Sequence, residues 1–382
     1  MSQLLVTAYN LGFGDTLLVT IPERQRGRET DRHVLIDFGN VLGKFDEESR
    51  IFGEVAEDIR RRLDGRPIDL YIMTHEHMDH VRGLTYASSL NIPLPIAYCW
   101  LTASSDPRYG LRYPRAEKRL ALYREEYQRV QLAIAAQGLT PAEPLQAFLA
   151  INDFNRTASC VDFIREAAAK KSSYIHRESR LVPGRNHPLR EAQISIWGPE
   201  ADTTVYYTRF RPVAAQAIQT LTGQPPSLEA PEGIDPIGFG KLIDFLKSGF
   251  SDNLLAIDRA ANNTSIVFLL EWRGWKLLFP GDADLRSWAF MERLGLLQPV
   301  HFLKVSHHAS RNGTPPEELL EKLLPAVRTD ARPRTALVST SPGVYNGVPD
   351  PQTQDRIRTR VDQVVDTRDA GLGHCVEVAF EG

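Results

Sequence analysis

The segment from residue 74 to residue 80 holds the densest group of side chains that could do chemistry. It reads Thr-His-Glu-His-Met-Asp-His, so three imidazoles and an aspartate lie within six residues. Neutral imidazole and carboxylate are good ligands for first-row divalent metals. We expect His75 and His77 to reach one ion, and Asp79 and His80 to point toward a second. Two ions roughly 3.5–4 Å apart can hold a hydroxide between them and stabilise both the attacking and the leaving oxygen of a hydrolysis.

Regular elements must position this segment. The apolar run at 68–73 predicts a buried strand before it, and residues 81–84 open a helix after it. Further strands are predicted at 4–9, 16–21, 33–40, 192–199, 266–272, 275–279, 302–305, 336–339, 364–367 and 375–380. Further helices are predicted at 52–63, 116–137, 147–171, 240–250, 287–296 and 352–361.

Other candidate groups follow predicted strands. Asp37 lies near the end of the strand at 33–40, where a carboxylate can accept the N–H of a ligating histidine and fix its tautomer. Asp282 follows a glycine after the strand at 275–279 and suits a bridge between two ions. Residues 306–310, Ser-His-His-Ala-Ser, follow another strand. The glycine turn at 12–14 is equally consistent with a plain hairpin, since no helix follows it.

The bulk composition is that of an ordinary globular protein. The chain has 382 residues, 42% hydrophobic and 24% charged, with a net charge of −3. This charge argues against a generally basic nucleic-acid binder but leaves room for a local basic groove. Cys99, Cys160 and Cys375 form no CxxC pair and favour a reducing compartment. No signal peptide or membrane-length apolar run is evident, so we expect a cytoplasmic protein without a membrane partner.

Residues 100–190 depart from the strand-rich pattern and predict an α-helical insertion. A lid, a protein-partner surface and a nucleic-acid clamp are all open for it. A positive groove could draw on basic residues of the insertion, namely Arg112, Arg115, Lys118, Arg119 and Arg124. The alternative is a salt-bridged, exposed helix in which these side chains pair with Glu117, Glu125 and Glu126.

The segment at 74–80 resembles the H-x-H-x-D-H signature of the metallo-β-lactamase-fold hydrolases. Within them the chain most resembles the hydrolase domain of ComEC, the DNA-uptake channel protein of competent bacteria. The matching motifs are Leu-Gly-Phe-Gly-Asp at 11–15, Leu-Ile-Asp-Phe-Gly at 35–39, Asn-Asn-Thr-Ser at 262–265, Leu-Phe-Pro-Gly-Asp at 278–282 and Leu-Lys-Val-Ser-His-His-Ala-Ser at 303–310. They occur in order and leave out the helical insertion and the 205–260 stretch.

This resemblance implies a single domain over 1–382, an αββα sandwich with the helical insertion at 100–190. It also implies the metal ligands His75, His77, Asp79, His80, Asp282 and one of His307 or His308. We favour His308 as the ligand and place His307 beside the substrate. Many relatives have a further ligand histidine in a G-H-x-x-G loop that this sequence lacks. His176 and His187 are candidates to replace it, although each reads more simply as a loop histidine.

The resulting hypothesis is a dinuclear hydrolase with two Zn or Mn ions, acting as a phosphodiesterase or nuclease through a metal-bound hydroxide. Asp282 would bridge the ions, Asp79 would orient the hydroxide, and Asp37 would hold a ligand histidine. Candidate phosphate contacts are His307, Lys304, Ser310 and Arg311. The partner would be nucleic acid or another phosphodiester.

Two other functions remain open at the level of sequence. The same metal pair could hydrolyse a small ester, a lactone or a lactam, with β-lactams least favoured in a cytoplasmic protein. Alternatively, the chain could be a non-catalytic, metal-stabilised effector that binds a protein partner through the helical insertion.

Overall fold

The computed structural model describes residues 2–25, 27–41, 45–136, 143–168, 171–207, 255–328, 330–341 and 348–382. The helix predicted at 240–250 lies outside these residues. The chain divides into two compact units. The first unit is Met1–Asp106, Asp153–Ala201 and Ala261–Gly382, and the second unit is Pro107–Asn152 and Asp202–Ala260. No helix in the described part of the chain is long and apolar enough to cross a lipid bilayer.

The first unit contains two sheets. Among the described residues, the first sheet has the strand order β13-β1-β2-β3-β4-β5-β6. Its strands are β1 (Gln3–Tyr9), β2 (Leu17–Gln25), β3 (Arg28–Ile36), β4 (Ile68–Ile72), β5 (Ile96–Thr102), β6 (Ser172–Ile175) and β13 (Cys375–Glu381). The strands from β13 to β3 pair antiparallel, and those from β3 to β6 pair parallel.

The second sheet is also mixed, with the order β12-β11-β10-β9-β8-β7. Its strands are β7 (Gln193–Gly198), β8 (Val267–Trp272), β9 (Trp275–Phe279), β10 (Phe302–Lys304), β11 (Thr335–Val338) and β12 (Gln363–Asp366). The four strands from β9 to β12 pair parallel, whereas β7, β8 and β9 pair antiparallel.

The two sheets pack face to face. One buried apolar cluster contains Leu70 and Ile72 of β4 together with Phe268 of β8 and Phe302 of β10. Tyr71, between the two β4 residues, is buried on the opposite face of its sheet, as the two-residue period of a strand requires. Buried side chains therefore cover both faces of β4, which is why its sequence is apolar apart from the half-buried Asp69.

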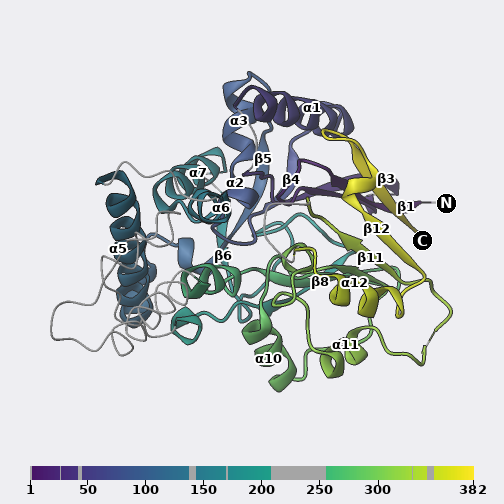
Figure 1. Ribbon diagram of the computed structural model, residues 1–382. Coiled ribbons are helices and arrows are strands. Elements are labelled where there is room, and N and C mark those ends of the chain that lie inside the picture. Colours follow the sequence, from purple (N-terminus) through teal and green to yellow (C-terminus); the bar gives the residue numbers. More distant parts are fainter. Residues whose placement is uncertain are drawn as a thin grey trace. The chain divides into compact units, whose positions relative to one another are not determined.

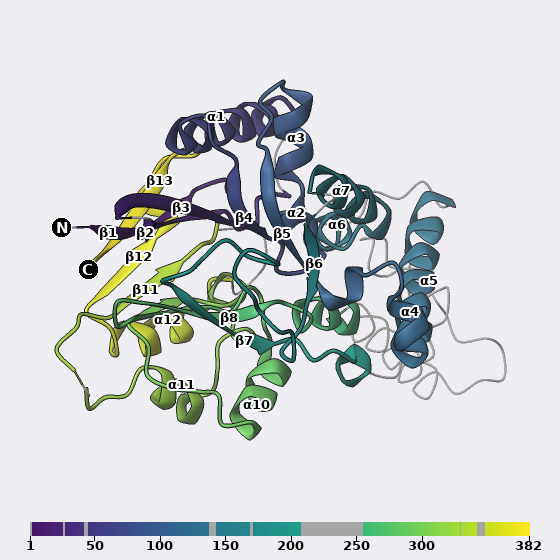
Figure 2. The ribbon, with the colours of Figure 1, turned by 180° about the vertical axis from the view of Figure 1, so that it is seen from behind.

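Helices cover the outer faces of both sheets. A second apolar cluster joins the outer face of the second sheet to α10 (Leu285–Arg293), α11 (Glu317–Leu323) and α12 (Pro351–Arg358). The helices α1 (Phe45–Leu63) and α3 (Gly83–Ser89) lie beyond the first sheet (Figures 1 and 2). This layering, helices outside and two sheets inside, confirms the predicted αββα sandwich.

The sequence-based elements differ from the observed ones mainly between residues 96 and 175. The strands β5 and β6 were not predicted, because β5 is an apolar run without a strand period and β6 has only four residues. The single helix predicted at 147–171 is two helices, α6 (Glu143–Ile151) and α7 (Phe154–Ala167). Asp153 separates them, and its carboxylate caps α7 by accepting hydrogen bonds from the backbone N–H groups of Asn155 and Arg156.

The described part of the second unit is helical. It contains α4 (Tyr109–Arg112), α5 (Pro114–Ala136) and α6. The Tyr127 hydroxyl of α5 donates a hydrogen bond to the Leu149 carbonyl of α6 at 2.5 Å. On the surface of α5, Arg124 pairs with Glu117 at 3.8 Å, as expected for a salt-bridged exposed helix. A nucleic-acid or protein partner for the helical insertion stays a prediction.

Candidate metal centre

The segment at 74–80 follows β4 and ends in a single helical turn, α2 (Met78–Val81). Neighbouring segments of the first unit hold its backbone. The Ile266 N–H donates to the Thr74 carbonyl at 2.9 Å, and the Phe38 N–H donates to the His80 carbonyl at 2.9 Å. Because these bonds come from segments beside strands of both sheets, the segment at 74–80 is fixed where the carboxyl ends of the parallel strands meet, the usual position of ligand sites in such sheets.

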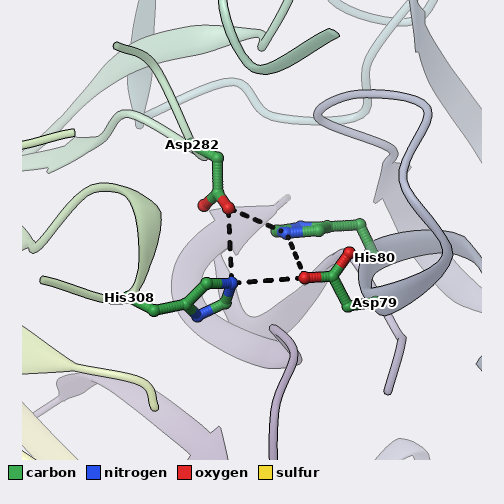
Figure 3. Close-up of side chains that lie close together, drawn as sticks. All are labelled: Asp79, His80, Asp282 and His308. Carbon is green, nitrogen blue, oxygen red and sulfur yellow. Dashed lines mark hydrogen bonds and ion pairs between the residues drawn. The ribbon is translucent and has the colours of Figure 1, made fainter. Parts of the chain in front are cut away.

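Four buried side chains converge at this point: Asp79, His80, Asp282 and His308. Figure 3 shows Asp79 and His80 on one side of the cluster and Asp282 and His308 on the other. One Asp282 oxygen, Oδ2, lies 3.3 Å from Nε2 of both histidines. Asp79 Oδ2 lies 3.3 Å from His308 Nε2 and 3.7 Å from His80 Nε2. We call these four residues the four-residue cluster.

Each histidine of the four-residue cluster is oriented through its other ring nitrogen. The His80 Nδ1–H donates to Asp37 Oδ2 at 2.8 Å. The His308 Nδ1–H donates to the backbone carbonyl of Ser339 at 2.8 Å. These bonds assign the proton to Nδ1 when the ring is neutral, so both Nε2 lone pairs face the carboxylates, as metal ligation requires.

His75 and His77 form a pair beside the four-residue cluster. His75 Nε2 and His77 Nδ1 are 3.1 Å apart, and the rings of His75 and His80 have centroids 4.2 Å apart. The Thr74 hydroxyl donates to Asp37 Oδ2 at 2.7 Å and therefore accepts the N–H of His75 Nδ1 at 3.0 Å. Asp37 thus sets the tautomer of His75 through Thr74, and the lone pair on His75 Nε2 faces His77 Nδ1.

The histidines at 307 and 308 lie in a left-handed turn. The φ angles of His307, His308 and Ala309 are 49°, 53° and 62°. The left-handed conformation costs roughly 1–2 kcal/mol for each residue with a Cβ, so the surrounding structure must hold it. The ring of Phe13 packs on the His308 ring with centroids 4.2 Å apart. This turn directs His308 into the four-residue cluster and leaves His307 outside it.

The electrostatics of the four-residue cluster favour bound cations. Burial lowers the pKa of His308, but the carboxylates of Asp282 and Asp79 outweigh this effect and raise it to about 10. The pKa of His80 is raised well above its usual value, because Asp282 and other carboxylates outweigh the effect of burial. In the absence of metal, protons on these imidazoles therefore supply the positive charge that the carboxylates require.

His75 behaves differently. Burial lowers its pKa well below 6.5, and the positive charges of His80 and His77 lower it further. Burial would raise the pKa of Asp282, but the ammonium of Lys304 and the imidazoles hold it well below its usual value. The site therefore offers an ionised carboxylate and a neutral imidazole at neutral pH, the protonation states that bind metals.

The residues present fit a divalent ion. Two buried carboxylate oxygens here make no hydrogen bond, namely Asp15 Oδ1 and Asp79 Oδ1. Buried polar atoms are normally satisfied, so their concentration at one place indicates ligand positions. Nitrogen and carboxylate donors without thiolate suit Zn or Mn.

The remaining predicted residues have other surroundings. His307 Nε2 lies 3.4 Å from the amide nitrogen of Asn262, and the Ser310 hydroxyl accepts the Gly313 N–H at 3.0 Å. Arg311 is exposed. The Lys304 ammonium contacts Asp282 Oδ1 at 3.2 Å and also contacts Asp15.

The two loop histidines are engaged elsewhere. His176 Nδ1 accepts the N–H of Glu178 at 3.2 Å. The ring of His187 lies against Trp100, with centroids 6.1 Å apart, and Glu23 is the charged group that acts on it. Neither histidine belongs to the groups of potential metal donors found among the described residues.

Sequence analysis missed several residues that build this site. Asp15 could have been found as a carboxylate directly after a glycine turn. Ser265, whose hydroxyl accepts the Asp282 N–H at 3.1 Å, lies in the Asn-Asn-Thr-Ser motif and had that signal. Ser339 contributes its backbone carbonyl, and because every residue has one, the sequence carries no signal for this contact.

Comparisons with known proteins add little to this geometry. No protein-family model matches the chain, and no curated protein matches it. A solved structure similar to it is that of the metallo-β-lactamase fold protein YhfI from Bacillus subtilis, with 11% identity, full coverage of both chains and a TM-score of 0.38. This similarity is low, and we infer neither fold nor function from it.

Proposed function

We propose that this protein is a metal-dependent phosphodiesterase or nuclease with two divalent ions of Zn or Mn. The observation that carries the proposal is the four-residue cluster. Two imidazole Nε2 atoms and two carboxylates, which follow strands of different sheets, converge there and are buried. Such a donor set suits metal binding better than a structural ion-pair network.

The ligands would divide between two positions. Asp79, His80, Asp282 and His308 would hold one ion, and His75 and His77 would contribute to the other. A bound ion supplies Lewis acidity and lowers the pKa of a coordinated water. The chain's own part is to hold ligands and position substrate: Asp37 fixes the tautomer of His80, and Asp79 Oδ1 is available to orient the attacking water.

Support for an anionic substrate comes from the turn after β10. His307 lies outside the four-residue cluster and is only half-buried. The Ser310 hydroxyl accepts one hydrogen bond and retains its own hydrogen for donation. The exposed guanidinium of Arg311 follows directly. Donors and a positive charge beside a metal site suit a phosphodiester, as does the resemblance to the ComEC hydrolase domain.

The test is hydrolysis of fluorescent single-stranded DNA and of bis-p-nitrophenyl phosphate by metal-free protein reloaded with Mn²⁺ or Zn²⁺. Asp79→Ala should abolish both activities. The matched control is Asp69→Ala. Asp69 belongs to the same unit, but its carboxylate pairs with the Arg32 guanidinium at 2.8 Å and is not part of the four-residue cluster. The control should retain activity.

Each outcome separates the candidate functions. DNA cleavage that Asp79→Ala loses, with DNA affinity that falls steeply with salt, would establish a nuclease. Cleavage of the small diester alone would indicate a small phosphodiester substrate. If neither is cleaved while ions bind, the phosphodiesterase proposal is wrong, and esters, lactones or a binding role come next.

A further inference from the structure

Lys304, the last residue of β10, has an ammonium group with three acceptors around it. The Lys304 side chain is buried, with 1% of the residue exposed. Its Nζ contacts Asp15 Oδ2, lies 3.2 Å from Asp282 Oδ1, and lies 3.3 Å from the Gly281 carbonyl. A lysine ammonium has three N–H donors. All three are therefore used within the protein, and a phosphate could bind Lys304 only by displacing a buried carboxylate.

Asp15 reaches this lysine from the other sheet. It lies in the turn between β1 and β2 of the first sheet, whereas Lys304 belongs to the second sheet. The backbone of Asp15 is tied to the metal-binding motif, since its N–H donates to the Asp79 carbonyl at 3.1 Å. Its carbonyl accepts the Gly39 N–H at 3.2 Å. The contact between Asp15 and Lys304 thus joins the two sheets where the halves of the four-residue cluster face each other.

The two oxygens of Asp282 have separate partners. Oδ1 faces Lys304, while Oδ2 faces Nε2 of both His80 and His308 at 3.3 Å. A carboxylate without such a contact could rotate and offer either oxygen, or both, to an ion. With Lys304 in place, only Oδ2 is directed into the four-residue cluster.

We infer that Lys304 and Asp15 form a positioning pair that fixes the Asp282 carboxylate so that Oδ2 alone serves the metal. This inference rests on the proposed metal binding, but it does not depend on the substrate. Asp15 acts through Lys304, and Lys304 acts through Asp282. Neither residue is assigned a contact with the substrate.

The test uses the double variant Asp15→Asn/Lys304→Met, which removes the positioning pair but keeps the net charge of the site. Positioning predicts that Mn²⁺ and Zn²⁺ affinity, measured by titration of metal-free protein, falls about tenfold or more, the usual effect of losing an outer partner of a metal ligand. The absorption spectrum of the Co²⁺-loaded variant should also change, since it reports coordination geometry.

The matched control is Arg32→Met/Asp69→Asn, which removes the ion pair between β3 and β4 and spares the cluster. It should lower the melting temperature without changing metal affinity or the Co²⁺ spectrum. If the double variant at residues 15 and 304 also keeps both wild-type metal properties, the pair is merely structural and the inference is wrong.

The single variant Asp15→Asn tests the same inference if the double variant fails to fold. It leaves the ammonium with Asp282 as its one carboxylate partner, so that Lys304 competes harder with the ion, and metal affinity should fall. Wild-type affinity in this variant would also overturn the inference. Wild-type protein that binds no metal would overturn the proposed function as well, whereas metal binding without phosphodiester hydrolysis would affect the proposed function alone.

Discussion

The four-residue cluster and the pair formed by His75 and His77 are built differently. The cluster draws ligands from both sheets, and each of its histidines has a hydrogen bond that orients the ring. The pair comes from a single loop, where the Thr74 hydroxyl contacts His75 and the two imidazoles contact each other. An ion in the cluster would meet donors fixed from several directions, whereas an ion at the pair would depend on a third donor. The cluster should therefore bind metal more tightly.

The largest effect should come from Asp282→Ala. This change removes the carboxylate that faces both cluster histidines and that the sequence predicts to bridge the two ions. We expect metal affinity at both positions to fall by at least about a hundredfold, beyond the effect of losing an outer partner. Metal content after dialysis and titration of metal-free protein would measure this. Loss at the cluster alone would mean that Asp282 is not shared.

His308→Ala and His77→Ala separate the two positions. His308→Ala should weaken the tighter of two binding phases by roughly a hundredfold, whereas His77→Ala should change that phase by less than about threefold. Calorimetric titration with Zn²⁺ resolves the two phases. Equal effects of the two variants on the tighter phase would contradict the predicted difference in metal affinity between the four-residue cluster and the pair formed by His75 and His77.

Asp37→Asn tests the orienting contacts. Asp37 has a φ of 53°, a left-handed conformation that asparagine tolerates, so the backbone should survive. The carboxylate accepts three hydrogen bonds, from the Thr74 N–H, the Thr74 hydroxyl and His80 Nδ1, whereas an amide has one acceptor oxygen and cannot accept all three. We expect an affinity loss of about tenfold, seen at both positions because Asp37 acts on His80 directly and on His75 through Thr74.

The smallest expected difference between the four-residue cluster and the pair formed by His75 and His77 is the number of protons released when metal binds. The raised pKa of His308, about 10, means that its protonated form stabilises the metal-free protein fully below pH 6.5, and that this stability is lost as pH rises through 10. An ion in the cluster must displace such protons, so its affinity should rise with pH up to about 10. At His75, whose pKa is lowered, no proton need leave at pH 7.

Calorimetry in buffers of different ionisation enthalpy counts these protons. At pH 7.5 the tighter phase should release about one proton or more per ion beyond the weaker phase. Equal proton release in both phases would show that the imidazoles of the cluster are neutral before metal binds.

Local patterns accounted for much of the site. The spacing at 74–80 and the carboxylate after the strand at 275–279 predicted residues that the structure brings together, because the carboxyl ends of parallel strands share one edge. Metal-ligand roles for these residues stay predictions. The strand β5 escaped prediction, since a short apolar run fits a buried helix as well as a strand, and the four residues of β6 are too few to show a strand period.

The sequence by itself supplied the candidate donor residues, because ligand chemistry depends on residue type and local spacing, and the resemblance of its motifs to a known family implied the αββα layering. The tertiary structure decided which neighbouring histidine enters the four-residue cluster. It did so through a left-handed turn that residues with a Cβ do not favour by themselves. It also placed the Lys304 ammonium against Asp15 and Asp282, so that the ammonium does not face a ligand. A buried ammonium must pair with carboxylates, and the fold decides which ones are close enough, because Asp15 and Asp282 are distant from Lys304 in the sequence.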